Sequence, residues 1–401
     1  MKWQPCQLQS LCAFATSGGT PSTSQAHFYG GTIPWLRTQE VTFNRITETE
    51  MTITEDGLAN SAARWIPEHS VIVAMYGNSA GRVAVNMIPL TTNQACCNLI
   101  LDASKADYRF IFYRLMLDYE VLRQMAKGAA QNNLNAGQVK SYTIRAPDVM
   151  EQRAIADVLS AYDDLIENNR RRMKLLEESA RQLYREWFVR LRFPGHERVK
   201  ITNSLPAGWV RKRIGDIADC VGGGTPSTAV PAYWEDGTVT WITPTDVTNN
   251  QHFVLLDGEK KISEAGLKNS SAKLVPSHAV LMTSRASVGY FAVTGREVCT
   301  NQGFISIVPQ DPLFSMFLLY QRCCRVEEIR SMGSGATYPE VSRGKFREFQ
   351  VLVPIRSLVA EFDEQATLLL AQIRNLKVQN QKISVARDLL LPKLMSGEIA
   401  V

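Results

Sequence analysis

The stretch Gly18-Gly19-Thr20-Pro21-Ser22-Thr23 recurs letter for letter as Gly223-Gly224-Thr225-Pro226-Ser227-Thr228. Other matches follow in the same order: Trp3 with Trp209, Trp35 with Trp241, Gly57-Leu58 with Gly266-Leu267, and Thr92-Asn93-Gln94 with Thr300-Asn301-Gln302. The offset between the copies drifts only from 205 to 209 positions. A period of about 200 residues is too long for a solenoid repeat or a propeller blade. The sequence therefore predicts a duplicated domain.

The first part of each copy is predicted to be mixed strand and loop. Short apolar runs, such as 70–74 and 279–282, lie between turn segments rich in Gly, Asn, Pro and Ser. Short helical stretches follow at 108–125 and 313–329. This combination of elements is typical of an α+β domain.

The last part of each copy carries a heptad pattern, in which apolar residues alternate at spacings of four and three. The seam of the first copy is formed by Ile155, Leu159, Tyr162, Ile166, Asn169, Met173, Leu176, Ala180, Leu183 and Trp187. The seam of the second copy is formed by Phe362, Ala366, Leu369, Ile373, Leu376, Asn380, Ile383, Arg387, Leu390 and Leu394. Each pattern predicts a helix of roughly 35 to 40 residues, about 50 to 60 Å long. Pro392 is expected to end or kink the second helix.

Each seam contains one asparagine, Asn169 as the fifth of its ten positions and Asn380 as the sixth. An antiparallel pair places these amides opposite each other, whereas a parallel pair sets each against Met173 or Leu376. A buried amide without a partner costs about 1 to 3 kcal/mol. The sequence therefore favours antiparallel packing.

The predicted organisation has approximate two-fold symmetry between the copies. It comprises a domain over 1–149, a spacer helix over 150–193, a linker over 194–204, a second domain over 205–356 and a second spacer helix over 357–396.

The composition is that of an ordinary globular protein, with 45% apolar and 21% charged residues among 401. No apolar run is long enough to span a membrane, and the N-terminal residues do not form a secretion signal. The eight cysteines include the adjacent pairs Cys96-Cys97 and Cys323-Cys324 but no CxxC. This pattern predicts a reduced cytoplasmic protein without a structural metal.

A search for catalytic motifs identifies no enzyme class. The Gly-rich segments are not followed by the Gly-Lys-Ser/Thr of a phosphate-binding loop, and HExxH, GxSxG and the Asn/Asp-Pro-Pro-Tyr of adenine methyltransferases are missing. A nuclease-like spacing of Asp257, Glu259 and Lys261 lies in a charged, Gly-containing turn. The net charge is +5, and basic residues cluster between Arg170 and Arg213, as on a solvated helix face or a surface that contacts nucleic acid.

Two loop-rich domains on a rigid spacer suit recognition better than chemistry, because loops on a rigid scaffold carry binding. B-DNA has local two-fold axes, so the arrangement fits a bipartite DNA site with one half read by each domain. Two alternatives stay open: an enzyme whose catalytic residues are unrecognised, and a coiled-coil scaffold whose domains bind protein.

Four segments carry a family resemblance: Gly223-Gly224-Thr225-Pro226, Trp241-Ile242-Thr243-Pro244-Thr245-Asp246, Thr300-Asn301-Gln302-Gly303-Phe304 and Leu390-Leu391-Pro392-Lys393-Leu394-Met395-Ser396-Gly397-Glu398-Ile399. They resemble the specificity subunit of type I restriction-modification systems, and the likeness covers essentially the whole chain. The first copy departs from the pattern at 35–40 and 94–96.

The resemblance implies two target-recognition domains, each reading a few base pairs of double-stranded DNA, separated by two long antiparallel helices. It implies two modification subunits that methylate adenine with S-adenosylmethionine, and restriction subunits that use ATP and Mg²⁺ to cut DNA. The specificity subunit itself is expected to bind no cofactor and to catalyse nothing.

Polar or cationic residues on expected loops are the candidates for DNA contact: Arg37, Tyr76, Asn78, Arg82, Thr245, Arg285, Ser287 and Tyr338. Arginine suits guanine and asparagine suits adenine in the major groove. Trp35 and Trp241 are expected in the core. The apolar residues Leu165, Phe188 and Leu368 lie outside the seams and are expected to face the modification subunits.

Overall fold

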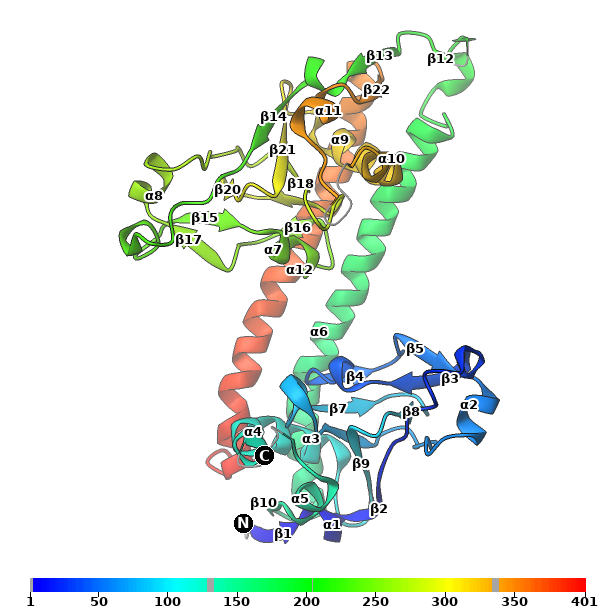
Figure 1. The fold of residues 1–401 in the computed structure, drawn as a ribbon, viewed down its shortest axis with the longest axis vertical. Helices are drawn as coiled ribbons and strands as arrows, with labels where there is room; N and C mark the ends of the chain where they lie inside the picture. The colour runs from blue at the N-terminus through cyan, green and yellow to red at the C-terminus, as the bar shows by residue number, and fades with distance from the viewer. Residues whose placement is uncertain (1–2, 128–132, 204, 334–338) are drawn as a thin grey trace. The chain divides into compact units, whose positions relative to one another are not determined.

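The computed structural model describes residues 3–127, 133–203, 205–333 and 339–401. The chain forms two compact units, one of Met1–Leu165 with Ile383–Val401 and one of Ile166–Lys382. Both boundaries fall inside the long helices α6 (Val149–Tyr184) and α12 (Arg356–Ser396). Each unit therefore takes its β-rich domain from one copy of the repeat and a helix segment from the other (Figure 1).

The first unit contains a five-stranded sheet in the order β2-β9-β6-β7-β4, a three-stranded sheet β5-β3-β8 and the pair β1-β10. Its strands are β1 (Gln4–Gln7), β2 (Cys12–Ser17), β3 (Tyr29–Leu36), β4 (Asn44–Ile46), β5 (Met51–Ile53), β6 (Val71–Ala74), β7 (Val83–Asn86), β8 (Thr91–Thr92), β9 (Cys96–Leu101) and β10 (Thr143–Ala146). Its shorter helices are α1 (Leu8–Leu11), α2 (Glu55–Ala59), α3 (Tyr108–Leu117), α4 (Tyr119–Lys127) and α5 (Ala136–Ser141).

The second unit repeats this topology, with sheets β14-β21-β18-β19-β16, β17-β15-β20 and β13-β22. Its strands are β11 (Ile201–Thr202), β12 (Leu205–Pro206), β13 (Val210–Arg213), β14 (Ala218–Gly222), β15 (Val239–Ile242), β16 (Val254–Leu255), β17 (Lys260–Ile262), β18 (Val280–Thr283), β19 (Phe291–Thr294), β20 (Cys299–Thr300), β21 (Phe304–Pro309) and β22 (Gln350–Val353). Its shorter helices are α7 (Pro244–Thr248), α8 (Glu264–Lys268), α9 (Phe314–Cys324), α10 (Val326–Ser331) and α11 (Arg343–Arg347).

The two units share strand directions as well as strand order. The edge strands β4 and β16 each run parallel to their neighbours β7 and β19, while the other pairings within both five-stranded sheets are antiparallel. The predicted α+β class with two similar domains is therefore confirmed. In the part of the chain that the structure describes, each helix is too short or too polar to cross a membrane.

The repeated Gly-Gly-Thr-Pro-Ser-Thr stretch explains why the two domains fold alike. A Cβ atom at Gly18 would lie 2.0 Å from the Thr92 carbonyl oxygen, and one at Gly223 would lie 2.1 Å from that of Asn301. Only glycine fits so close to another backbone. The next glycine in each copy then accepts an indole N–H through its carbonyl, from Trp35 at 3.0 Å and from Trp241 at 2.9 Å. Both tryptophans are buried, which confirms their expected place in the core.

The long helices depart from the sequence predictions at two points. Helix α6 widens into a π-turn, Arg185–Val189, and Phe188 is buried within it among aromatic side chains. The expectation that Phe188 faces outward was wrong, because a π-turn has more residues per turn than an α-helix and rotates Phe188 inward. Helix α12 continues through Pro392 to Ser396, so of the two expected effects of Pro392, an end or a kink of the helix, the first does not occur.

Candidate nucleic-acid interface

Two equivalent loops stand between the central strands of the five-stranded sheets. The first loop (residues 75–82) joins β6 to β7, and the second loop (residues 284–290) joins β18 to β19. Each turns through two left-handed residues, Gly77 and Gly81 in the first and Ala286 and Gly289 in the second. The φ angles are 65° at Gly77 and 85° at Gly81 in the first loop, and 60° at Ala286 and 86° at Gly289 in the second. The two loops therefore join equivalent strands and have left-handed residues at similar places, but they differ in length by one residue and carry different side chains.

Five of the candidate DNA-contacting residues lie on these two loops. Tyr76, Asn78, Arg285 and Ser287 are exposed, and Arg82 is half-buried. Tyr76 and Arg285 form equivalent isolated β-bridges, with Asn133 and Glu340 respectively. The Arg285 guanidinium also lies 3.5 Å from the Glu340 carboxylate. Tyr338 lies outside the described residues.

Sequence reasoning missed Tyr290, which follows Gly289 as Arg82 follows Gly81. Each loop thus presents one tyrosine and one arginine in exchanged order, Tyr76 and Arg82 in the first and Arg285 and Tyr290 in the second. Both tyrosines are 43% exposed. An alignment of the two copies that matches Gly81 with Gly289 places Tyr290 opposite Arg82, so the sequence alone could have identified Tyr290.

The remaining candidates, Arg37 and Thr245, lie on a second pair of equivalent segments. Arg37 precedes the 3₁₀ turn Thr38–Glu40, and Thr245 is exposed in α7. The Arg37 amide donates to Glu40 at 3.0 Å, as the Thr243 amide donates to Asp246 at 2.7 Å. The Arg37 guanidinium is engaged by Glu50 at 2.6 Å.

The repeated Thr-Asn-Gln motif joins these segments to the loops. In the first unit, the Asn93 amide donates to Leu36 at 3.0 Å, and Met75 donates to Ala95 at 2.8 Å. In the second unit, Asn301 donates to Ile242 at 3.0 Å and Ser284 donates to Gly303 at 2.8 Å. Arg37 and Thr245 therefore lie near the first and second loop respectively, within one surface in each unit.

Several charged side chains outside these surfaces form structural contacts. Asp257 accepts from the Thr240 hydroxyl at 2.7 Å and lies near Arg296 and Lys261. Burial opposes ionisation of Asp257, but these donors and cations outweigh it and lower its pKa. No cluster of three metal-ligating side chains occurs among the described residues. On α6, several arginines of the basic run pair with glutamates, such as Arg171 with Glu167 and Arg181 with Glu177.

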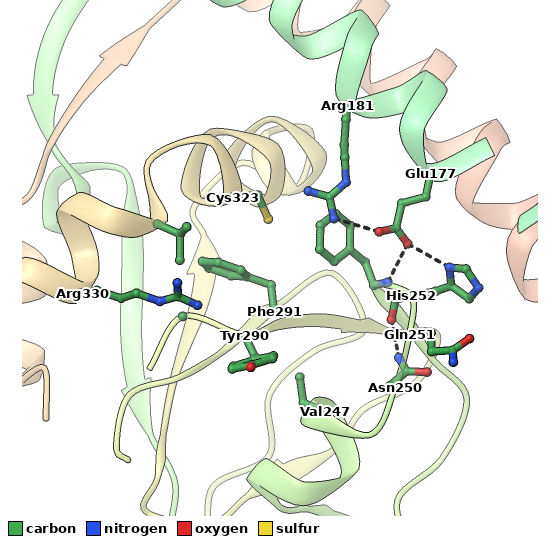
Figure 2. Close-up of a pocket in the computed structure, with 13 residues that line it drawn as sticks. Glu177, Arg181, Val247, Asn250, Gln251, His252, Tyr290, Phe291, Cys323 and Arg330 are labelled. Carbon is green, nitrogen blue, oxygen red and sulfur yellow. Dashed lines mark hydrogen bonds and ion pairs between the residues drawn. The ribbon is translucent and has the colours of Figure 1, made fainter. Parts of the chain in front are cut away.

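Both long helices hold the strand at the edge of the second unit's five-stranded sheet, and Figure 2 shows the contacts made by α6. The buried Glu177 carboxylate of α6 accepts from the Phe253 amide at 3.0 Å and Arg181 at 2.9 Å, and lies 3.4 Å from His252 Nδ1. Lys377 of α12 donates to the Val254 carbonyl at 2.7 Å. Burial lowers the pKa of Lys377 to about 8. These contacts fix the segment 250–254 beside a pocket that Tyr290 also lines.

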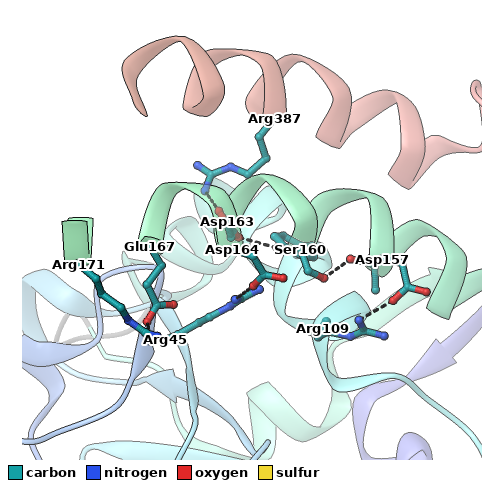
Figure 3. Close-up of polar contacts among 11 residues, drawn as sticks. Arg45, Arg109, Asp157, Ser160, Asp163, Asp164, Glu167, Arg171 and Arg387 are labelled. Carbon is teal, nitrogen blue, oxygen red and sulfur yellow. Dashed lines mark hydrogen bonds and ion pairs between the residues drawn. The ribbon is translucent and has the colours of Figure 1, made fainter. Parts of the chain in front are cut away.

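The first unit also attaches its edge strand to α6, through an ion pair between side chains (Figure 3). Arg45, on the edge strand β4, pairs with Asp164 of α6. The neighbouring Asp163 accepts from Arg387 of α12 and from the Tyr113 hydroxyl. Arg387 is the one charged residue of the second seam, and its place there is explained by this partly buried carboxylate partner.

The seam asparagines lie opposite each other, as antiparallel pairing requires. Asn169 Nδ2 donates to Asn380 Oδ1 at 2.8 Å, and Asn380 Nδ2 donates to the Ile166 carbonyl at 3.1 Å. Most seam positions are buried, among them Ile155, Leu159, Ile166, Met173, Ala180, Phe362, Ala366, Ile373, Leu376 and Leu394. Partly buried positions comprise Tyr162, Leu176, Leu183, Trp187, Leu369, Ile383 and Leu390.

The repeated sheets, the equivalent loops and the paired helices define a duplicated α+β protein with one candidate recognition surface in each unit. The family model of the type I restriction modification DNA specificity domain matches residues 1–178 and 206–365. The chain belongs to this family and is a DNA specificity subunit of a type I restriction-modification system.

Curated relatives and a solved structure agree with this assignment. The chain is 26% identical over 402 residues to the MjaIX specificity subunit of Methanocaldococcus jannaschii, covering 96% of this chain and 90% of the relative. It is 23% identical over 324 residues to the HindI specificity subunit of Haemophilus influenzae, and this match covers 65% of this chain and 70% of the relative. The S subunit from M. genitalium has the same fold, with a TM-score of 0.59 and 18% identity, and the match covers 98% of this chain and 96% of that subunit.

Proposed function

We propose that the chain reads a bipartite, asymmetric DNA target with one half-site per β-rich domain. The observation that carries the proposal is the pair of loops at 75–82 and 284–290, which join equivalent strands of the two units but present different exposed side chains. Equivalent scaffolds with different reading residues suit two half-sites of different sequence. The spacer helices then set the distance between the half-sites.

We further propose that this chain directs adenine methylation or DNA cleavage without catalysing either. Two modification subunits would supply S-adenosylmethionine chemistry, and restriction subunits would supply ATP- and Mg²⁺-dependent cleavage, so the chain itself would need no cofactor. The curated relatives named as specificity subunits support this division of labour. The exposed Leu165 and Leu368 are candidate contacts for the modification subunits. The eight free cysteines fit work in the cytoplasm.

Selection of bound sequences from random DNA, with modification subunits present, tests the reading residues. Arg285→Ala should relax one half-site and Arg82→Ala the other, since each arginine contact to a base carries about 1 to 3 kcal/mol of discrimination. Arg170→Ala, an exposed change on α6, is the matched control and should alter neither. Relaxation of both half-sites by one loop variant would contradict the proposal.

Two assays separate the alternatives. Turnover by the purified chain alone with S-adenosylmethionine or with Mg²⁺ on DNA would favour an enzyme. A chain with partners that shows no DNA preference at any salt concentration would favour a protein scaffold. The proposed function expects salt-sensitive binding that sharpens when modification subunits are added.

A further inference from the structure

A groove of about 530 Å³ lies at the carboxyl end of α6 in the second unit. The chain leaves the helix there through the π-turn, and the groove also borders the end of α9 and strand β22. Its apolar wall includes Phe188, Val189 and Leu352. Its cations are Arg185, Arg190 and Arg325. Val189 is 60% exposed, although it is fully apolar.

A second groove of about 380 Å³ lies at the carboxyl end of α12 in the first unit. It borders the end of α3 and strand β10. Trp3, Leu117, Pro392 and Met395 form its apolar wall, and Arg114 and Arg145 are its cations. Leu117 is 37% exposed.

The two grooves are the same site, built once by each copy of the repeat. Residues of α12 that line the first-unit groove stand 207 positions after residues of α6 that line the other: Pro392 after Arg185, Met395 after Phe188, and Ser396 after Val189. The same interval separates the short-helix residues Leu117 and Cys324, and the strand residues Arg145 and Leu352. The two grooves thus correspond to each other under the internal repeat.

Arginines line both grooves, but they come from different elements in the two units. In the second unit two arginines come from the end of the long helix, whereas in the first they come from α3 and β10. None of the residues that line either groove is acidic. Arg145 donates to the Trp3 carbonyl at 3.3 Å, and the carboxylate of Glu178 lies 3.9 Å from Arg185. Arg190 pairs with Glu186, Arg325 with Glu328 and Arg114 with Asp118. Each groove therefore combines an accessible apolar wall with one less tightly held arginine: Arg185, whose carboxylate contact is 3.9 Å long, and Arg145, which forms no ion pair among the described residues.

We propose that these two grooves are equivalent docking sites, each for the same segment of a partner subunit, in which an apolar anchor residue is flanked by carboxylates. The inference rests on the proposed function, in which partner subunits assemble on this chain, and it adds where and how two copies are held. Carboxylates complement the arginines, and an apolar anchor covers Val189 or Leu117. A DNA backbone supplies charge but nothing for the apolar walls, so protein is the better fit.

The test places a charge on each apolar wall and counts the partners. Val189→Glu in one groove and Leu117→Glu in the other should each weaken one site by about 10- to 100-fold, since a buried aliphatic contact is lost. Native mass spectrometry of the chain with modification subunits should then show two partners on the wild type, one on each single variant and none on the double variant. Ile201→Glu is the matched control, because Ile201 is 58% exposed and lies outside both grooves.

A second pair of variants distinguishes a loss of docking from misfolding. Arg185→Glu and Arg145→Glu leave the apolar walls intact and should cause the same loss of partners while circular dichroism stays unchanged. Unaltered stoichiometry in all variants, with a wild type that recruits two partners and selects DNA, overturns the docking proposal alone. Weaker DNA binding by the isolated variants with unaltered stoichiometry assigns the grooves to DNA and also overturns it. A wild type that recruits no partner contradicts the proposed function, and the docking proposal with it.

Discussion

Glu177 shows how one buried residue holds a segment of the chain beside the candidate interface. It is a buried carboxylate on α6 that accepts hydrogen bonds from Arg181 and from the Phe253 amide and lies beside His252. It thereby holds the segment that leads into the edge strand β16. Burial raises the pKa of Glu177, but hydrogen bonds from His252, Arg181 and the Phe253 amide outweigh burial, so its net pKa lies below the ordinary value. The ionised carboxylate therefore stabilises the folded state.

This carboxylate predicts a specific dependence of stability on pH. Because its pKa is lower in the folded than in the unfolded chain, its contribution is present above the unfolded pKa and is lost as pH falls through the folded pKa. Glu177→Gln should lower the free energy of unfolding at pH 7 by about 1 to 3 kcal/mol. Urea unfolding measured from pH 7 down to pH 3 should show a smaller loss with acid for this variant.

The control for this experiment is Glu178→Gln, on the next position of α6 and half exposed. It should change the free energy of unfolding by less than about 1 kcal/mol at any pH, as exposed ion pairs do. An identical acid dependence in Glu177→Gln and the wild type would contradict the assigned role.

At the scale of elements, the two long helices carry polar layers within apolar seams. One layer is the Asn169–Asn380 amide pair in the second unit, and the other is the Asp163–Arg387 ion pair in the first. A polar pair in a seam is stable only opposite its partner, whereas apolar residues tolerate sliding. These layers therefore fix which residues of α6 and α12 face each other.

Replacing the amide layer by leucine should release the register without unfolding the helices. For Asn169→Leu with Asn380→Leu, we expect unchanged circular dichroism and a wider distribution of preferred gap lengths in selection from random DNA. Exchange of Met173 and Leu376, both buried in the same seams, is the apolar control and should leave the distribution narrow. Loss of helical signal in the leucine variant would count against the layer as a register device.

At the scale of the whole molecule, both long helices pass from one compact unit into the other. The boundaries fall after Leu165 in α6 and after Lys382 in α12. Residues inserted at both points leave the contacts within each unit intact. The length of the spacer and the identity of the two half-sites are therefore separable properties.

Insertion of seven residues at both boundaries should lengthen the preferred gap while both half-sites keep their sequence. Seven helical residues add about 10 Å, at about 1.5 Å each, or about three base-pair steps of about 3.4 Å. Selection from random DNA measures the gap and the half-sites together. Changed half-sites in the inserted variant would show that spacing and reading are coupled.

The exposed loop positions of the candidate interface were predictable from the sequence in part. Tyr76, Asn78, Arg285 and Ser287 were identifiable because polar residues beside Gly and Asn indicate exposed turns. The place of Arg37 and Thr245 beside these loops depends on hydrogen bonds made by the Thr-Asn-Gln motif, far away along the chain. Sequence spacing carries no such information.

The sequence by itself determined the duplication, the α+β class, the two long helices and the family. These rest on recurrence and on local periodicity, which depend only on the order of residues along the chain. Only the tertiary structure decided that Phe188 turns inward, that Arg387 meets Asp163, and that each helix end forms a groove. Each of these depends on which distant side chains fill the adjoining space, and packing and desolvation act only once the chain has folded.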